Sequence, residues 1–431
     1  MVSVPSLGTR VVAVGMARAP GVANAWTARR FRHSQNRHHS LDRLDRVAVV
    51  LQRQKKLQTP AQRVADLTFS SRHINLLLDR HRRLREWYWH PTCKGLIAMD
   101  VTQFNVNELF QKSIVWDAHC GMDPQVPIDV NSLERIRKAG FTFVSTNVGY
   151  DVLPWHDTFP VIAGYRKFLS QNTDKYILVS SVADVLAAKR EGKLAVSMDI
   201  EGVSALDGKI ELVETYHRLG VRQISFVYNK DNAGGSGCHG SDTGITQFGR
   251  EVVREMNRVG MLVDGTHCSP KMSIDMAETS SKPIVISHSN SRVLHDHPRN
   301  IWNEQAIACA HTGGVIGVTG IRLFLAKPGD ATSNLDLLVR NIDHYCELVG
   351  PQHVGIGTDF AEITNALATR FENATDYWPF EHYQGAASLE FVDIEVFPQL
   401  TAALSAKGYS NMDISGILGG NFMRVAAANW E

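Results

Sequence analysis

The 431-residue chain has no run approaching about 18 consecutive apolar residues, so we expect no transmembrane helix. Its six cysteines are scattered without Cys-x-x-Cys spacing, which excludes a disulfide framework and the usual redox or structural zinc motifs. The C-terminal residues form no hydrophobic tail of the kind that precedes a lipid anchor. With 44% hydrophobic and 21% charged residues, the composition is that of a globular protein. We expect a reducing, cytoplasmic location and no stable membrane insertion.

Acidic residues are absent before Asp42, whereas arginines are frequent there. Residues 1–99 contain 18 Lys and Arg against 5 Asp and Glu, a net charge of +13. The remaining residues contain 27 Lys and Arg against 39 Asp and Glu, a net charge of −12. This asymmetry predicts two regions, a basic extension at 1–99 that is disordered or partly helical, and a folded domain at 100–431.

Three interpretations of the basic extension remain open. The first is a poorly ordered or over-extended N-terminus, with Met99 as the natural start. The second is a removed targeting segment, because such segments are rich in arginine and poor in acids. The third is a basic surface for nucleic acid or membrane. No recognised nucleic-acid motif occurs in it, so we expect no nucleic-acid partner.

Between residues 113 and 360, short apolar runs alternate with stretches of helical periodicity. This alternation predicts βαβ units and a parallel sheet. Eight runs over about 250 residues match the size of an α/β barrel of the (β/α)8 TIM-like type, and a doubly wound open sheet is the alternative. The predicted strands are Ile114–Ala118, Phe141–Asn147, Leu194–Ile200, Gln223–Tyr228, Met261–His267, Pro283–His288, Val315–Gly320 and Val354–Asp359. The predicted helices include Ser132–Ala139, Ser181–Glu191, Ile210–Leu219, Gln247–Val259 and Leu335–Leu348.

Histidines and carboxylates stand at the ends of five of the eight runs. In a parallel barrel these ends form the rim where the chemistry of the fold is built. A single histidine at such a position is more often only hydrogen-bonded, but five ligand-type residues on five strands favour a metal site. Imidazoles and carboxylates suit Zn²⁺ and similar ions, and a shared carboxylate can bridge two of them. The candidate ligands are His119, Glu201, His267, His288 and Asp359.

A series of short motifs occurs in a fixed order from Ile114 to the C-terminus. They are Asp117–His119, Ile200–Gly202, Phe248–Val253, Met256–Gly260, Val263–His267, Ser287–Ser289, Pro298–Asn300, Gly355–Phe360 and Gly420–Phe422. Their order and spacing resemble the membrane (renal-type) dipeptidase family, metal-dependent peptidases among the amidohydrolase-like barrels. The resemblance implies a binuclear zinc site that hydrolyses dipeptides by a metal-bound hydroxide, with tolerance for a D-residue at the C-terminal position. Relatives are commonly dimers, so a homodimer is a further expectation.

The resemblance also implies a role for each candidate ligand. His119 and Glu201 would bind one zinc ion, and Glu201 would bridge to a second ion held by His267 and His288. Asp359 would contact the metal-bound water and act as the acid and base that moves its proton.

Three further residues are expected to contact the substrate. Arg299 falls where the family binds the C-terminal carboxylate, and a guanidinium fork suits that group. Taken alone, such an arginine is more often a salt-bridge partner. Tyr228 occupies the position of a catalytic histidine in many members, and a phenol can also donate a hydrogen bond to an oxyanion. Asn229 follows it at the same strand end.

The main departure from the family pattern lies on the first strand, where His-x-Asp is replaced by His119-Cys120-Gly121. Glycine offers no ligand, Asp123 could substitute only in a rebuilt loop, and Cys120 should point to the opposite face of the strand. We therefore expect one or two zinc ions, the first position being weak or empty. The alternative function is a barrel with a defective or single-metal site that binds a small ligand or catalyses a non-hydrolytic reaction such as isomerisation.

Overall fold

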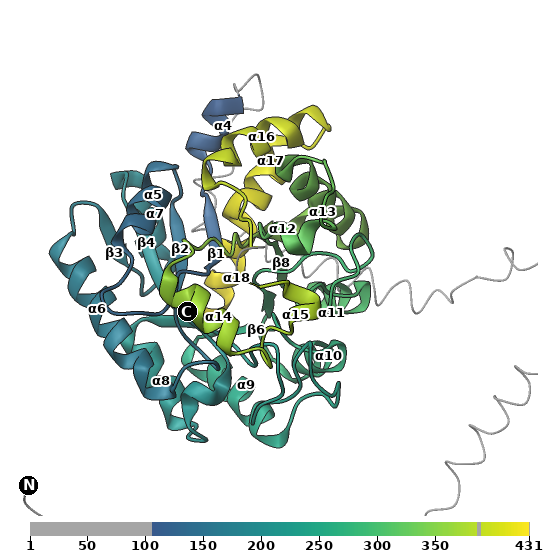
Figure 1. Cartoon of the computed structure of the whole chain (residues 1–431). Coiled ribbons are helices and arrows are strands. Elements are labelled where there is room, and N and C mark those ends of the chain that lie inside the picture. Colours follow the sequence, from purple (N-terminus) through teal and green to yellow (C-terminus); the bar gives the residue numbers. More distant parts are fainter. Residues whose placement is uncertain (1–105, 386–388, 431) are drawn as a thin grey trace, which may run out of the picture. The chain divides into compact units, whose positions relative to one another are not determined.

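The computed structural model describes residues 106–385 and 389–430, so the predicted extension at 1–99 and the predicted domain start at residue 100 lie outside the described residues. Parallel strands lie at the centre and helices surround them (Figure 1). The strands on the continuous path of the sheet are β1 (Trp116–Cys120), β2 (Phe143–Tyr150), β4 (Leu194–Glu201), β5 (Val221–Ser225), β6 (Leu262–Asp264), β7 (Val285–Ile286), β8 (Val315–Val318) and β9 (Val354–Ile356).

These strands pair in the order β1-β2-β4-β5-β6-β7-β8-β9, and every pair is parallel. The two end strands approach each other at their C-terminal ends, where the backbone N–H of Asp359 donates to the carbonyl oxygen of His119 at 2.9 Å. The sheet therefore forms a nearly closed barrel. The predicted (β/α)8 TIM-like fold is confirmed, and the open sheet is excluded.

A strand overlaps each of the eight predicted runs, but the bounds differ: β1, β2 and β4 extend beyond the predicted ends, whereas the other five strands stop earlier. β5 stops at Ser225, before Tyr228 and Asn229, and β6 stops at Asp264, before His267. The reason is backbone conformation: Asn229, His267 and Asp359 have φ angles of 60°, 66° and 55°, in the left-handed region that a strand cannot contain. Asn229, His267 and Asp359 thus stand in turns after the strands, whereas His119 and Glu201 lie within β1 and β4.

One strand, β3 (Tyr176–Leu178), is absent from the sequence prediction. It pairs only with the first residues of β4, off the continuous path of the sheet. A three-residue apolar run is too short to be separated from a loop by periodicity.

The helices of the predicted βαβ units are all present. Gln247–Val259, for example, begins after Thr246, whose hydroxyl accepts from the N–H of Gly249, and ends at Gly260 with a φ of 84°. The described helices are α4 (Val106–Lys112), α5 (Val130–Lys138), α6 (Thr158–Gln171), α7 (Val182–Glu191), α8 (Glu211–Leu219), α9 (Gln247–Val259), α10 (Pro270–Thr279), α11 (Asn303–His311), α12 (Arg322–Leu325), α13 (Asn334–Val349), α14 (Asn365–Asn373), α15 (Phe380–Tyr383), α16 (Phe397–Ala406), α17 (Asn411–Ser415) and α18 (Asn421–Trp430). None of them is both long and apolar enough to cross a membrane.

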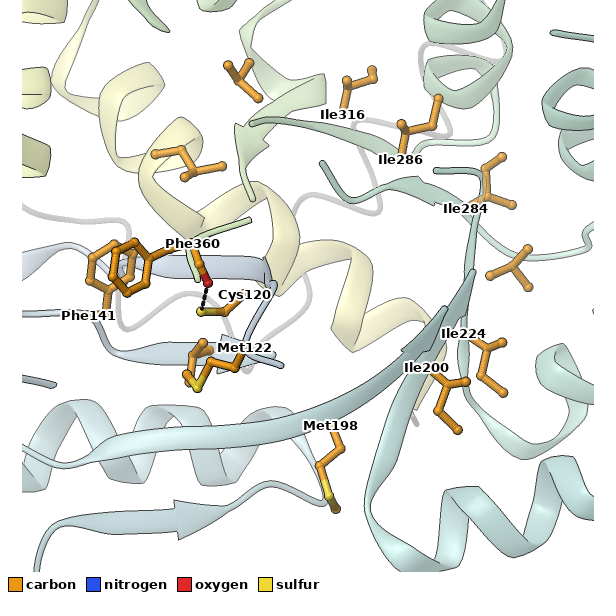
Figure 2. Packing of buried hydrophobic residues seen from close by; sticks show 14 of the residues in the cluster. Cys120, Met122, Phe141, Met198, Ile200, Ile224, Ile284, Ile286, Ile316 and Phe360 are labelled. Atoms are coloured by element: carbon orange, nitrogen blue, oxygen red, sulfur yellow. Dashed lines mark hydrogen bonds between the residues drawn. The ribbon is translucent and has the colours of Figure 1, made fainter. Parts of the chain in front are cut away.

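Side chains alternate between the outside and the inside of the barrel. Along β4, Met198 and Ile200 belong to the main hydrophobic core, whereas Asp199 and Glu201 are the buried polar residues between and after them. Figure 2 shows Met198 and Ile200 near Ile224 of β5 in this core. Apolar packing of the sheet against the helices thus leaves the polar side chains of the same strands for the barrel interior.

The two ends of the barrel differ in chemistry. At the N-terminal end, Trp116 and Phe143 begin β1 and β2 and stack with ring centroids 3.6 Å apart. Phe422 and Trp430 of α18 stack on Trp116 from below, at 6.4 and 5.7 Å. Aromatic side chains therefore fill this end, and the ligand-type residues gather at the other.

A segment that we call the cap, residues 361–385, follows β9 and contains α14 and α15 (Figure 1). Its aromatic residues Phe371, Trp378 and Tyr383 form one hydrophobic cluster with Tyr150 at the end of β2 and Phe324 of α12. The cap is thereby packed onto the C-terminal end of the barrel.

Candidate metal centre

All five ligand-type residues predicted from the sequence meet at the C-terminal rim of the barrel. The Oε1 atom of Glu201 lies 2.8 Å from the Nε2 of His267, 3.4 Å from that of His288 and 3.7 Å from that of His119. Asp359 approaches from the last strand, 3.5 Å from the Nε2 of His119 and 3.9 Å from that of His288. Residues separated by up to 240 positions thus present their polar atoms to a common centre.

Two overlapping groups within this cluster can each hold a metal ion. One consists of His119, His288 and Asp359, and the other of Glu201, His267 and His288, with the ligand atoms of each group within 4.8 Å of one another. The groups share His288, whereas the sequence predicts Glu201 as the shared residue. Glu201 nevertheless lies within 4 Å of all three imidazoles, so it remains central to both.

A β-bulge aims His119 into the barrel. The register of β1 against β2 shifts between Asp117 and Cys120, which breaks the alternation of side chains along the strand. Trp116 belongs to the cluster at the N-terminal end of the barrel, whereas Cys120 belongs to the main hydrophobic core. Strict alternation would place His119, three positions after Trp116, on the opposite side of the strand from Trp116. The bulge instead turns His119 toward the centre of the barrel.

His119 is held in one tautomer by a buried carboxylate. Its Nδ1 lies 3.0 Å from Oδ1 of Asp199, and Oδ2 of Asp199 accepts from the hydroxyl of Ser145 at 2.6 Å. Since a carboxylate only accepts, Nδ1 carries the proton and Nε2 carries a lone pair. That Nε2 is buried and has no hydrogen-bond partner among the described residues. An orphaned lone pair aimed at carboxylates fits a site for a cation.

The other two histidines, like His119, each have a hydrogen-bond acceptor beside Nδ1. The Nδ1 of His267 lies 2.7 Å from Oδ1 of Asn229, which accepts its proton. The Nδ1 of His288 lies 2.8 Å from the hydroxyl of Ser287, whose own proton goes to Asp264 at 2.5 Å. Both Nε2 atoms therefore carry lone pairs, although they lie only 3.1 Å apart. Two lone pairs at this distance repel each other unless a cation lies between or beside them.

The electrostatics of the site agree with this geometry for two of the three histidines. Burial lowers the pKa of His267 and of His288 well below 6.5, and the positive charge of Arg299 adds to the effect. Burial raises the pKa of Glu201 to about 8, against the attraction of His119. His267 and His288 are therefore neutral and can accept a cation at once. Burial opposes the charged form of His119, but the carboxylates of Asp199 and Glu201 raise its pKa well above 6.5, so a metal ion bound there would displace the proton of its Nε2.

Arg299 lies beside the cluster as a buried cation. The residue is 3% exposed, and no carboxylate lies within 4.0 Å of its guanidinium in the part of the chain that the structure describes. Its Nη2 atom lies 3.4 Å from the Nε2 of His267 and 3.4 Å from the carbonyl oxygen of His288. Its Nη1 atom donates to the hydroxyl of Ser289 at 3.5 Å. Burial raises the pKa of the nearby Glu201 and the charge of Arg299 acts to lower it, but a desolvated guanidinium without a carboxylate in direct contact still offers a site for an anion.

Tyr228 and Asn229 differ in whether their polar groups are available to a bound molecule. The ring of Tyr228 lies 4.4 Å from that of His267, and its hydroxyl accepts from the indole N–H of Trp378 at 3.2 Å. Asn229 is fully buried; its amide nitrogen donates to the carbonyl oxygen of Tyr377 and its oxygen accepts from His267. Tyr228 can donate its phenolic proton to a bound molecule, whereas the amide of Asn229 is engaged within the protein.

The position of Gly121 faces the cluster. A Cβ atom placed on it would lie 2.5 Å from Oδ1 of Asp359, so a side chain here would enter the site. Neither neighbouring candidate replaces the missing ligand. The thiol of Cys120 donates to the carbonyl oxygen of Phe360 at 3.0 Å within the core (Figure 2), and Asp123 forms an ion pair with Arg370 of α14.

Gly121→Ala is expected to lower the free energy of unfolding by about 1–3 kcal/mol, because the added methyl group collides with Asp359 in a packed site. Chemical denaturation of the two proteins measures the difference. Gly265→Ala is the matched control, since a Cβ there meets its neighbours only at ordinary contact distances of 3.6 Å or more. Equal stability of the Gly121→Ala variant and the parent chain would contradict the described packing.

Sequence reasoning missed the residues that orient the ligands. Asp199 lies two positions before Glu201 on the same strand, so the period of two could have placed both on one face. Asn147 of β2 donates to the second oxygen of Glu201 at 2.6 Å, and a polar residue inside an apolar run was its signal. The aromatic residues of the segment 361–388, Tyr383 among them, indicate a pocket-lining or dimer-contact insertion, but the sequence does not show that Tyr383 contacts Asn229.

A nearly closed parallel barrel with histidines and carboxylates converging at its C-terminal rim defines a barrel of the amidohydrolase-like type. A sequence model of the membrane dipeptidase family, peptidase family M19, matches residues 144–380. The chain belongs to this family. Glu201, His267, His288, Arg299 and Asp359 lie inside the matched segment, while the bulged first strand precedes it.

Individual relatives agree with the family. An uncharacterised dipeptidase of Schizosaccharomyces pombe is 30% identical over 276 residues, which cover 62% of this chain and 61% of that protein. Dipeptidase tcpJ of Claviceps purpurea is 29% identical over 272 residues, 62% of this chain and 59% of that protein. The chain thus spans about three fifths of the length of these relatives. The crystal structure of an amidohydrolase from Pseudomonas aeruginosa is 30% identical, with a TM-score of 0.67, and covers 76% of this chain and 99% of that one.

Proposed function

We propose that the protein is a zinc-dependent dipeptidase that hydrolyses the amide bond of small dipeptides. The observation that carries this proposal is the convergence of three imidazole lone pairs and two carboxylates beside the buried Arg299. Membership in the membrane dipeptidase family and the dipeptidases among the relatives support it. The cytoplasmic location and a homodimer remain predictions from the sequence.

The proposed roles follow from the surroundings of each side chain. One or two zinc ions held by the five ligand-type residues would polarise the scissile carbonyl and lower the pKa of a water molecule. Asp359 is the most open of the clustered carboxylates, with 15% of its side chain exposed, and would take the proton of the attacking water and deliver it to the leaving amine. The negative charge of Glu201 would help to neutralise the positive charge of the bound zinc.

The substrate would be held from two sides. Arg299 would bind the C-terminal carboxylate, since its guanidinium is buried without a carboxylate partner among the described residues. The hydroxyl of Tyr228 already accepts a hydrogen bond from Trp378, so it would donate its proton to the oxyanion that develops on the scissile carbonyl.

Gly121 favours a second candidate function. Without a carboxylate at this position, one of the two metal positions has fewer ligands, and a barrel with a single ion could bind a small ligand or catalyse a non-hydrolytic reaction such as isomerisation. Retention of Glu201, His267, His288 and Asp359 around one centre argues for hydrolysis instead.

We expect one to two zinc ions per chain by elemental analysis, and hydrolysis of dipeptides that is lost with a chelator and restored by Zn²⁺. Zinc at about 100 times its Kd should raise the free energy of unfolding by about 2.7 kcal/mol, since the folded chain alone contains the site. Full activity in the chelated, zinc-free chain would contradict the proposal. A zinc-loaded chain that cleaves no member of a dipeptide panel would favour the second candidate.

A further inference from the structure

The cap reaches one candidate metal ligand through two buried side chains. His267 contacts Asn229 at 2.7 Å, the amide nitrogen of Asn229 lies 3.1 Å from the hydroxyl of Tyr383, and that hydroxyl lies 3.1 Å from the Nε2 of His239. Asn229 is fully buried and Tyr383 is 2% exposed. A continuous hydrogen-bonded chain thus connects α15 of the cap to the metal-facing histidine.

The direction of these hydrogen bonds is fixed by their partners. The amide nitrogen of Asn229 also donates to the backbone carbonyl of Tyr377 at 2.9 Å, and a carbonyl can only accept. This contact sets the amide group, so its oxygen must face His267 and accept the Nδ1 proton. Tyr383 accepts from the same amide nitrogen, and its hydroxyl lies 3.1 Å from the Nε2 of His239, whose pKa is lowered to about 4 by burial and the neighbouring His382.

His267 differs from the other two histidines in what orients it. His119 is oriented by the carboxylate of Asp199, and His288 through Ser287 by that of Asp264, all on the barrel itself. The partner of His267 is a neutral amide in the left-handed conformation on a loop, with a φ of 60°. A neutral amide has no intrinsic preference for presenting oxygen rather than nitrogen, so its orientation depends on its neighbours. These are the two cap contacts to its nitrogen and the thiol of Cys238, which donates to its oxygen at 3.4 Å.

We propose that Asn229 and Tyr383 are positioning residues that hold His267 in its metal-binding tautomer, which makes the cap a structural part of the metal centre. The proposal rests on the function proposed above, because it requires that the centre binds zinc. It assigns to Asn229 an orienting role in place of the substrate contact expected from the sequence.

The test is the zinc affinity of the full-length chain, measured by competition with a chromophoric chelator. Tyr383→Phe keeps the ring in its aromatic cluster and removes the hydroxyl, and we expect it to weaken zinc binding about 10–100-fold, as is typical for the loss of an outer contact to a ligand. Tyr377→Phe is the matched control. It removes a hydroxyl from the same cap, one that donates to the backbone of Asp151 at 3.2 Å, and should change the affinity less than about twofold.

A double-substitution comparison tests the route of the effect. In the Asn229→Ala background, Tyr383→Phe should cause less than about a twofold further loss, because the side chain through which it acts is absent. A full additional loss in that background would overturn the proposal. Asn229→Ala itself should also weaken zinc binding about tenfold or more, and it replaces Tyr383→Phe as the test variant if circular dichroism shows that the latter is unfolded.

The two proposals fail separately. Zinc binding by Tyr383→Phe and Asn229→Ala within about twofold of the parent chain overturns the positioning role and leaves the dipeptidase proposal intact. Absence of zinc binding by the parent chain overturns the metal centre itself.

Discussion

Glu201→Gln is expected to reduce dipeptide hydrolysis at least about 10³-fold, which corresponds to about 4 kcal/mol of transition-state stabilisation. The carboxylate lies within 4 Å of three imidazole nitrogens, while its second oxygen accepts from Asn147. An amide of the same shape removes the negative charge that the cationic centre needs, and it cannot bridge two ions. Initial rates with saturating zinc, together with the zinc content of the variant, measure the effect.

Glu372→Gln is a suitable control, because Glu372 is an exposed residue of α14 and its substitution makes the same chemical change away from the cluster. The control should keep the rate of the parent chain. Circular dichroism of Glu201→Gln should match that of the parent, since the isosteric amide keeps the shape of the side chain. A fully active Glu201→Gln variant would remove the basis for the proposed catalytic centre.

Arg299→Met should lower kcat/KM for unmodified dipeptides by about 10²–10³-fold, because loss of one partner of a buried charge pair typically costs 2–5 kcal/mol. Methionine fills a similar volume without the charge, which limits the loss of packing around His267 and Phe324. The decisive comparison uses dipeptides whose C-terminus is amidated. Those substrates lack the carboxylate that Arg299 would bind, so the parent chain and the variant should cleave them at similar, low rates.

Arg254→Met, on the exposed face of α9, provides the corresponding control for a lost arginine. It should leave kcat/KM for both kinds of substrate unchanged. An equal loss by Arg299→Met on free and amidated dipeptides would mean that this arginine supports the site without recognising the carboxylate.

The barrel and its ligands could be predicted because they depend on short-range patterns. Apolar runs of regular spacing mark buried parallel strands, and ligand-type residues at their ends meet at one rim whatever the length of the intervening helices. His119, Glu201, His267, His288 and Asp359 were found in this way, and the structure brings them together. Their individual roles as ligands remain proposals.

Other features depend on contacts that no local pattern encodes. His119 faces the centre and Cys120 the hydrophobic core, as expected, but the bulge in β1 that accompanies this arrangement is revealed only by the register against β2. Asn229 was expected at the substrate because it ends a predicted strand, yet its amide is used by His267 and the cap. Tyr383 lies 154 positions after Asn229 in a segment without a strand, so its approach to the site is a property of tertiary packing.

The left-handed conformations of Asn229, His267 and Asp359 bear on attempts to engineer this protein. A non-glycine residue held in this region costs on the order of 1–3 kcal/mol, although asparagine, aspartate and histidine adopt it more readily than other side chains. Glycine at position 267 or 359 would relieve that strain while deleting a proposed ligand. A selection for heat resistance alone would therefore tend to erase the proposed catalytic centre, and directed evolution of this barrel would have to select for turnover in every round.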